Sequence, residues 1–384
     1  MDAFQSILTP YLNIIKTPVI DYAERKLRLR LPKIPYHLFA ELIKATERCF
    51  SDEPNILHLN GPIHVVGCLY GHILDLLGVL QTFGFPPKTH YLFLGNLIDQ
   101  GEFSLEVLTL VFALKLIYPE FIHVIRGDHE TKDVCLLKEF HNDLLADYDD
   151  KLFFPCIKAF SQIPLAAIID NKFICLSGGF GPNILDITTV DFIKRPAIIL
   201  NDPNLIEILF SDPTEYLPMF MPSSRGFGNL FGENAVSEFL KVNKFQGLIR
   251  GRQFEEEGVK MYFNQTCASV CTASGERGKP SVLRVEDGNL IPHNLKHLPP
   301  LNRADAVFIL SESETTYVPD SDITKYRARK LSVGMLVLSG VKLGAQQSES
   351  GKRLSMTTLP RVKPDSHPVS KTQRNPPRRT IVRF

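Results

Sequence analysis

Three short apolar runs between residues 63 and 125 constrain the fold of this chain more than any other feature. The runs are Ile63–Val66, Tyr91–Leu94 and Phe121–Ile125. Each ends at or just before a glycine, and segments of helical length and periodicity, 72–83 and 103–117, separate them. Strands that alternate with helices in this way predict a βαβαβ unit with a parallel sheet. Sites in such sheets form beyond the carboxyl ends of the strands, so we expect the chemistry in the three glycine turns.

The three turns carry recognisable motifs. They read GCLYGH over 67–72, GNLIDQG over 95–101 and GDHE over 127–130. They resemble the motifs G-D-x-H-G, G-D-x-x-D-R-G and G-N-H-E of the catalytic subunits of protein serine/threonine phosphatases, type 1 above all, in the metallophosphoesterase superfamily. The flanking segments Gly84–Pro87 and Tyr91–Gly95 agree as well, and the resemblance covers about residues 5 to 300.

The resemblance implies an α/β fold, a metallophosphoesterase-type two-sheet β-sandwich flanked by helices. We expect residues 1–60 to form a helical segment packed on a phosphatase-like domain of residues 61–299. From about residue 300 the composition shifts to Pro, Ser, Thr and scattered charge, which predicts a mostly disordered basic tail over 300–384.

Further elements follow from periodicity. Residues 135–160 and 234–242 have helical spacing, and 165–169 and 173–176 are typical of strands. Four more short strands are predicted at 247–250, 260–263, 268–271 and 281–285, and we assign all four to the second sheet.

Charge and cysteine content exclude several classes of protein. The formal net charge is +1, which offers no overall field for nucleic acid or membrane, although residues 346–384 carry nine Lys/Arg against two acidic residues. The seven cysteines show no CxxC pair or regular spacing, which argues against a disulfide framework. The sequence starts with no leader-like segment and contains no 18-residue apolar window, so we expect an intracellular protein, cytoplasmic or nuclear.

The resemblance also implies a metal site, and here the sequence departs from the family. The family binds two metal ions, such as manganese, iron or zinc, at six ligand positions, which correspond here to Cys68, Tyr70, Asn96, Asp128, Ser177 and Arg252. An amide cannot bridge two cations as a carboxylate does, and a guanidinium that never deprotonates repels a dication. We therefore expect no cofactor. Two alternatives are unfavourable: His72 as a replacement ligand would have to point back across the glycine turn, and Cys68 as a ligand for a soft metal lacks neighbours of suitable type.

Other parts of the family's machinery match. Asp99 and His129 correspond to its acid pair, Arg225 to one phosphate-binding arginine, and Gln100 to the position of the second. Either the Asp99–His129 pair keeps a catalytic role or it is a buried hydrogen bond that holds two turns together. Similarly, Arg252 either pairs with Asp99 or Asp128, or joins Arg126 and Arg225 in an anion pocket.

We expect a catalytically inactive phosphatase-like protein, a pseudophosphatase that acts in binding, scaffolding or regulation. Its partners would be proteins, either phosphatase regulatory subunits or phosphoproteins, and neither nucleic acid nor membrane. Two alternatives stay open: a weak metal-dependent phosphatase that uses Asp99, Asp128 and His129, and a phosphopeptide-binding module that does not hydrolyse. Ser332 and Ser355 each follow basic residues and are candidate phosphorylation sites.

Overall fold

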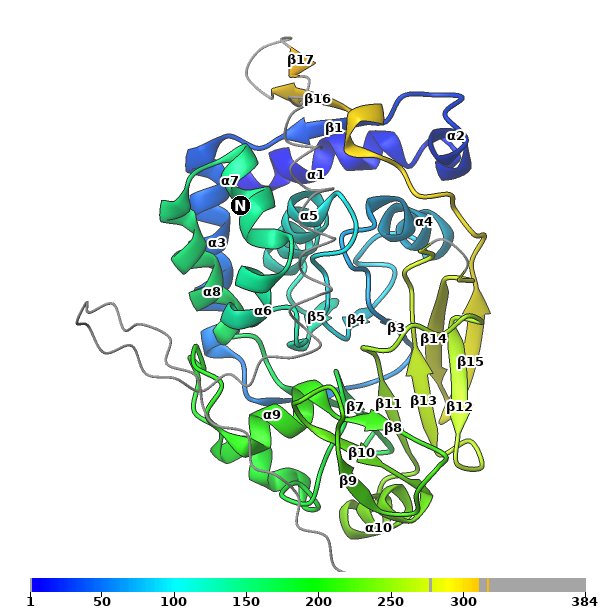
Figure 1. Cartoon of the computed structure of the whole chain (residues 1–384). Coiled ribbons are helices and arrows are strands. Elements are labelled where there is room, and N and C mark those ends of the chain that lie inside the picture. The colour runs from blue at the N-terminus through cyan, green and yellow to red at the C-terminus, as the bar shows by residue number, and fades with distance from the viewer. Residues whose placement is uncertain (1, 276–277, 311–315, 318–384) are drawn as a thin grey trace, which may run out of the picture. The chain divides into compact units, whose positions relative to one another are not determined.

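A computed structural model describes residues 2–275, 278–310 and 316–317 (Figure 1). The α-helices are α1 (Asp2–Ile14), α2 (Val19–Ala23), α3 (Tyr36–Asp52), α4 (Ile73–Phe83), α5 (Ser104–Ile117), α6 (Lys132–Leu137), α7 (Phe140–Asp147), α8 (Phe153–Ser161), α9 (Pro203–Phe210) and α10 (Glu233–Asn243). Short 3-10 helices are η1 (Asp150–Leu152), η2 (Ile187–Phe192) and η3 (Arg303–Asp305). The predicted helix over 135–160 is therefore divided among α6, α7, η1 and α8. In the described ranges, no helix has the length and apolar character needed to cross a bilayer.

Two larger sheets form the body of the protein. The five-stranded sheet has the order β15 (Asn289–Asn294), β14 (Ser281–Glu286), β3 (Ile63–Val66), β4 (Tyr91–Phe93), β5 (Ile122–Val124). The six-stranded sheet has the order β12 (Val259–Tyr262), β13 (Cys267–Val270), β11 (Gly247–Arg250), β7 (Phe173–Leu176), β6 (Ala166–Ile169), β2 (Ile56–Leu59). Strands β3, β4 and β5 run parallel, with α4 and α5 as the connections, so the predicted βαβαβ unit is confirmed.

One strand was assigned to the wrong sheet. β14 pairs antiparallel with β3, with Val282 opposite Val66, and thus belongs to the five-stranded sheet. Its alternating pattern correctly indicated a strand, but alternation does not say which edge the strand will pair with.

The two sheets pack face to face, as expected for a sandwich. Their shared core contains Val65, Leu92 and Ile125 from one sheet and Ile249 and Val270 from the other, all fully buried. These strands are apolar on both faces because helices cover the outer surfaces. A cluster that includes α1, α3, α4, α5 and α8 covers the five-stranded sheet, and α9 and α10 pack on the six-stranded one (Figure 1).

The two sheets also meet at their carboxyl-terminal edges. Cys68, just after β3, and Cys271, just after β13, form an isolated parallel bridge. Strands β7 and β11 run parallel to β13, so their carboxyl ends open toward the same edge. The turns that follow β3, β4, β5, β7 and β11 are thereby brought together.

The N-terminal and C-terminal ends of the domain differ from expectation. Besides helices, residues 1–60 contain two strands, β1 (Arg30–Lys33) and β2. Residues 300–310 were assigned to the disordered tail, but they form η3 and β16 (Val307–Leu310), which pairs in parallel with β1. The Arg303 guanidinium, 7% exposed, donates to Glu106 at 2.8 and 2.9 Å, and this buried contact holds the segment on α5. The last described strand is β17 (Thr316–Tyr317), and residues 318–384, with Ser332 and Ser355, lie outside the described residues.

Candidate functional site

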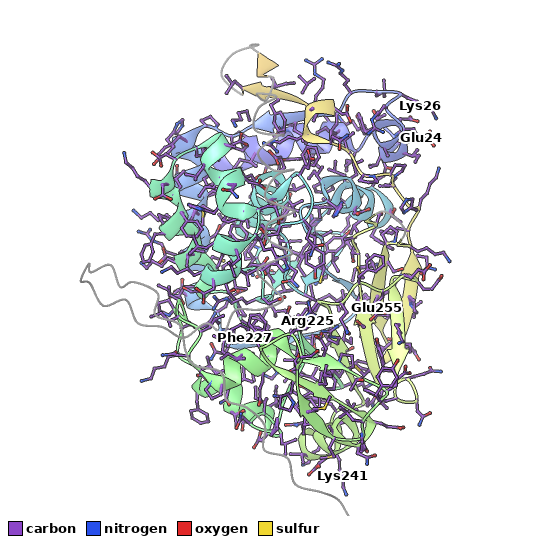
Figure 2. All side chains as sticks on the ribbon, in the orientation of Figure 1. Glu24, Lys26, Arg225, Phe227, Lys241 and Glu255 are labelled. Carbon is purple, nitrogen blue, oxygen red and sulfur yellow. The ribbon has the colours of Figure 1, made fainter. Side chains whose placement is uncertain are left out.

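A cleft of about 340 Å³ lies where the carboxyl-terminal turns of both sheets meet. Its lining residues are Tyr70, His72, Gln100, Asp128, His129, Arg225, Arg252, Gln253, Phe254, Glu255, Tyr262, Ala273 and Gly275. The small sheet of β8 (Asp212–Pro213), β10 (Asn229–Phe231) and β9 (Phe220–Pro222) carries Arg225 on its β9–β10 loop. Figure 2 labels Arg225 and Glu255, which come from different parts of the chain and line the cleft together.

The backbone of the turns is close-packed and strained. A side chain at Gly95 would collide with the backbone of Gly127, so only glycine allows the second and third turns to approach. Non-glycine residues with left-handed backbone angles gather around the cleft: Tyr70 (φ 46°), Asn96 (φ 54°), Asp99 (φ 72°), Gln100 (φ 58°) and Arg252 (φ 67°). Such conformations cost about 1–3 kcal/mol each and persist where the surrounding structure enforces them, typically at functional sites.

Glu130 ties the turns together. Its carboxylate accepts hydrogen bonds from the backbone N–H groups of Asn96 (2.8 Å), Leu97 (2.7 Å) and Gly127 (3.0 Å). Burial raises the pKa of this carboxyl group above its ordinary value. Glu130 is the last residue of the GDHE motif, and the motif alone did not predict this positioning role.

The structure brings Asp99 and His129 into contact, as their family match implied. Asp99 Oδ2 lies 2.6 Å from His129 Nδ1, and Asp99 Oδ1 accepts from the backbone N–H of Phe140 at 2.7 Å. Burial lowers the pKa of His129, but the hydrogen bond to Asp99 and its charge outweigh burial, so the pKa is raised. The ring of Tyr70 stands edge-on to the imidazole at 5.0 Å. The pair is geometrically intact, and its catalytic role stays a prediction.

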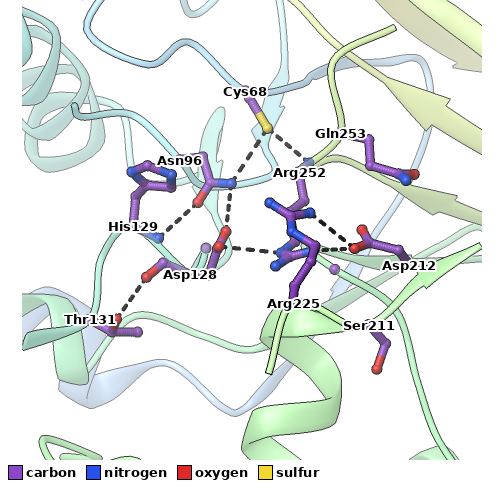
Figure 3. A network of polar contacts seen from close by, with 12 residues as sticks. Cys68, Asn96, Asp128, His129, Thr131, Ser211, Asp212, Arg225, Arg252 and Gln253 are labelled. Carbon is purple, nitrogen blue, oxygen red and sulfur yellow. Dashed lines mark hydrogen bonds and ion pairs between the residues drawn. The ribbon is translucent and has the colours of Figure 1, made fainter. Parts of the chain in front are cut away.

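Arg252 lines the cleft, and its guanidinium lies between Asp128 and Asp212 (Figure 3). Its Nε lies 3.2 Å from Asp128 Oδ2, and its Nη1 pairs with Asp212 Oδ2. Arg252 is 6% exposed, and its guanidinium carbon lies 5.5 Å from the centre of the Phe210 ring. Burial lowers the pKa of Arg252, but the two carboxylates raise it by more, so the residue stays charged. Of the two partners expected from the sequence, Asp128 is confirmed and Asp99 is wrong, because Asp99 is held by His129.

Asp212 forms ion pairs with three arginines, a role that the sequence analysis did not predict. Besides Arg252, it pairs with Arg250 Nη2 at 2.8 Å and with Arg225 Nη1 at 3.1 Å. Burial raises the pKa of Asp212, but the charges of Arg250 and Arg252 outweigh it, and the pKa lies below its ordinary value. No local pattern marks Asp212, because the arginines that pair with it lie 13, 38 and 40 positions further along the chain.

The predicted arginine pocket has a different membership. Arg225 and Arg252 line the cleft, but Arg126 does not. The Arg126 guanidinium is fully buried and donates to the backbone oxygens of Glu130 (3.1 Å) and Ala197 (2.9 Å). The sequence places Arg126 next to the third turn but does not show which way its side chain points. The third arginine of the cluster around Asp212 is Arg250.

The remaining ligand-position residues form an interlocked set. Cys68 Sγ accepts from the Arg252 backbone N–H at 2.8 Å and from Asn96 Nδ2 at 3.6 Å. Tyr70 donates its hydroxyl to the Arg252 backbone oxygen at 2.7 Å. Burial raises the pKa values of both Cys68 and Tyr70, which keeps them protonated at neutral pH. The Ser177 hydroxyl is buried and has no hydrogen-bond partner among the described residues.

These donors do not fit the pair of metal ions that the family motifs imply. Asp128 is the one carboxylate among the six positions, and it is already paired with Arg252. In the described part of the chain, no three His, Cys, Asp or Glu side chains converge to hold a metal ion. His72, the proposed replacement ligand, lines the cleft, and burial lowers its pKa to about 4.

Comparisons with known proteins agree with this geometry. Residues 61–251 match the sequence profile of the calcineurin-like phosphoesterases. The chain is 33% identical over 284 residues to a PP2A-like serine/threonine-protein phosphatase, PPG1, of Candida albicans, which covers 71% of this chain and 68% of that protein. The chain belongs to the serine/threonine-protein phosphatase family.

Other phosphatases support the assignment. The catalytic subunit of serine/threonine-protein phosphatase 4 from Kluyveromyces lactis is 33% identical over 241 residues, which is 62% of this chain and 78% of the relative. A solved Saccharomyces cerevisiae serine/threonine phosphatase with similarity to human PP5 superposes with a TM-score of 0.64 at 27% identity, over 68% of this chain and 90% of that one. The predicted family and fold class are thus confirmed.

Membership in this phosphatase family overturns one prediction. The expectation of no cofactor is wrong, because the matching profile and the relatives are those of a metal-dependent class of phosphatase. That expectation treated the exchange of all six ligand residues as decisive. The family as a whole points to a metal-using protein.

Proposed function

We propose that this member of the phosphatase family is a pseudophosphatase, an intracellular protein that binds phosphorylated proteins or phosphatase regulatory subunits in a scaffolding or regulatory role without hydrolysing the phosphoester. The observation that supports the proposal is the position of Arg252. A permanently charged guanidinium, held by Asp128 and Asp212, lines the cleft at a position where the family motifs have a metal ligand.

The other side chains in the cleft support the same view. Hydrolysis needs a nucleophile, and Asp128 is neutralised by its ion pair with Arg252. The hydroxyl of Tyr70 is protonated and donates to a backbone oxygen. Among the described residues that line the cleft, none is an activated nucleophile. His129 could protonate a leaving group but could not start the reaction.

Phosphate binding, in contrast, is favoured by charge and exposure. Three guanidinium groups, of Arg225, Arg250 and Arg252, share the two carboxylates of Asp128 and Asp212, which leaves this cluster one positive charge in excess, and Glu255 adds one carboxylate to the lining of the cleft. The side chain of Arg225 is 58% exposed and held by one ion pair. It can therefore turn toward a phosphate at little cost, since exposed ion pairs contribute at most about 1 kcal/mol.

Two measurements on one protein sample test the proposal. Phosphatase activity on a phosphoserine peptide is measured with manganese, zinc and iron supplied, for wild type and His129→Ala. Binding of the same peptide and its unphosphorylated form is measured for wild type and Arg225→Ala. We expect no turnover above the His129→Ala background, preference for the phosphorylated form, and loss of that preference in Arg225→Ala. Turnover that disappears in His129→Ala would disprove the proposal.

The alternative function is a weak metal-dependent phosphatase. The 2.6 Å contact between Asp99 and His129 favours it, because this is the acid pair that the family motifs imply. The identity of 33% to two phosphatases also favours it. The same assay decides between the two, since only the alternative predicts turnover that depends on His129.

A further inference from the structure

A second cavity of about 160 Å³ adjoins the cleft and has no part in the function proposed above. Its lining residues are Gly71, His72, Ile73, Leu74, Asp75, Gln100, Gly101, Glu102, Phe103, Leu298, Pro299, Pro300, Leu301 and Asn302. We call it the side pocket. His72 and Gln100 line both the cleft and the side pocket, so a ligand in the cleft lies next to it.

The walls of the side pocket are apolar and firmly held. Leu298 and Leu301 are 7% and 8% exposed, and both belong to the core that packs on the five-stranded sheet. Phe103, at the start of α5, is 2% exposed. Two prolines between the leucines stiffen this wall and lack backbone N–H groups that could attract an anion. The wall is anchored through Arg303, whose backbone N–H donates to Glu102.

The charge of the side pocket is negative. Glu102 and Asp75 line it, and no lysine or arginine among the described residues does. The guanidinium of Arg303, nearby in the chain, is paired with Glu106 and Asp147. The side pocket therefore combines apolar walls with the carboxylate of Glu102, since burial raises the pKa of Asp75 to about 7 and both oxygens of Asp75 accept hydrogen bonds from Ser274.

We propose that the side pocket binds an arginine or lysine side chain of a protein whose phosphorylated residue lies in the cleft, an inference that rests on the proposed function. A basic side chain has an apolar stem and a charged, hydrogen-bond-donating head, which match the leucine and proline wall and the carboxylate of Glu102. An acidic side chain would be repelled, and an apolar one would desolvate the Glu102 carboxylate without supplying an opposite charge. The size is suitable, since a cavity of about 150 Å³ holds a benzene-sized group.

The test compares two phosphoserine peptides that differ at flanking positions only in arginine or citrulline, which has nearly the same shape without the charge. Fluorescence polarisation on the full chain should show that the arginine peptide binds about fivefold more tightly, which is the difference in affinity that one partly exposed ion pair gives. The preference should disappear in Glu102→Gln, which keeps an acceptor for the Arg303 N–H. Glu256→Gln, which lines neither cavity, is the matched control and should keep the preference.

Equal affinity for the two peptides in wild type, or a preference that survives Glu102→Gln, would overturn the inference while the proposed function stands. If neither phosphopeptide binds, the phosphoprotein-binding part of the proposed function fails, and the side pocket is then tested alone. Saturation-transfer NMR with Nα-acetylargininamide and Nα-acetylcitrullinamide should show a signal for the first that Glu102→Gln removes. No difference between these two probes would also overturn the inference.

Discussion

The side-chain amide of Asn96 donates to Asp128 Oδ1 at 2.9 Å and links the turns after β4 and β5. The family motifs have Asp in the second turn and Asn in the third, so this chain carries the two residues in exchanged positions. With this exchange, the carboxylate of the third turn, Asp128, faces Arg252. The ion pair with Arg252 and the exchange of Asn96 with Asp128 thus belong together.

The first prediction concerns this exchange. Asn96→Asp would place two carboxylates within hydrogen-bond distance and should lower the free energy of unfolding by about 1–3 kcal/mol, because a buried donor is replaced by a repelling acceptor. Adding Asp128→Asn should restore the hydrogen bond and recover part of the loss. Urea unfolding of both single variants and the double variant measures the coupling. Strictly additive effects would contradict the prediction.

The second prediction concerns Arg252. Arg252→Met should cost about 3–5 kcal/mol in the free energy of unfolding, because Asp128 loses its ion-pair partner in a buried site and Asp212 loses one of three. The control is Arg225→Met, which removes an exposed partner of Asp212 and should cost less than about 1 kcal/mol. Comparable losses in the two variants would show that burial of the guanidinium is not what matters.

The third prediction concerns pH and Asp75. Burial raises the pKa of this carboxyl group to about 7, although its oxygens accept from the Ser274 N–H at 2.7 Å and the Ser274 hydroxyl at 2.5 Å. A raised carboxyl pKa means that the folded protein holds a proton that the unfolded chain releases. The stabilisation that this bound proton gives the folded protein is complete below about pH 4 and is lost as the pH rises to about 7. The stability of wild type relative to Asp75→Asn should fall by about 1.4 kcal/mol per pH unit in this window.

Urea midpoints between pH 4 and 8 measure this difference. Glu256→Gln, at a solvent-exposed carboxylate, should run parallel to wild type throughout. A wild-type advantage that grows with pH would show that the folded-state pKa of Asp75 is lowered rather than raised.

The fourth prediction concerns His129. Because Asp99 raises the pKa of the imidazole, Asp99→Asn should lower it, and NMR titration of the ring protons would detect the change. The stabilising effect of the charged pair should be complete below the unfolded-state pKa of about 6.5 and be lost as the pH rises through the folded-state value. If the imidazole of His129 titrates with the same midpoint in Asp99→Asn as in wild type, the 2.6 Å contact with Asp99 does not stabilise the charged imidazole, and the prediction is wrong.

The fifth prediction concerns metal content. Arg252→His removes the cation from the cleft and returns an imidazole, which is a common metal ligand, to that position. Metal per chain, measured by mass spectrometry after incubation with manganese, zinc and iron, should rise above the wild-type value. Arg225→His, which adds an imidazole but leaves Arg252 in place, should not raise it. Equal content in wild type and Arg252→His would show that the guanidinium does not control metal binding.

Local patterns in the sequence were sufficient for the βαβαβ unit, the helices α4, α5 and α10, the strands β6 and β7, and the phosphatase family. Each depends on short-range periodicity or on a glycine where two backbones touch, as at Gly95 and Gly127. The contact of Asp99 with His129 was accessible in the same way, because both residues follow neighbouring parallel strands.

The tertiary structure alone decided which residues pair with the charged side chains and which strands lie next to one another. It turned Arg126 into the interior, brought Arg225, Arg250 and Arg252 around Asp212, placed β14 beside β3, and held residues 300–310 on the domain through Arg303. These outcomes depend on which distant segment approaches and on where a long side chain points. Neither quantity has a local sequence pattern, because an ion pair or a strand ladder is formed between residues that the chain separates and only packing brings together.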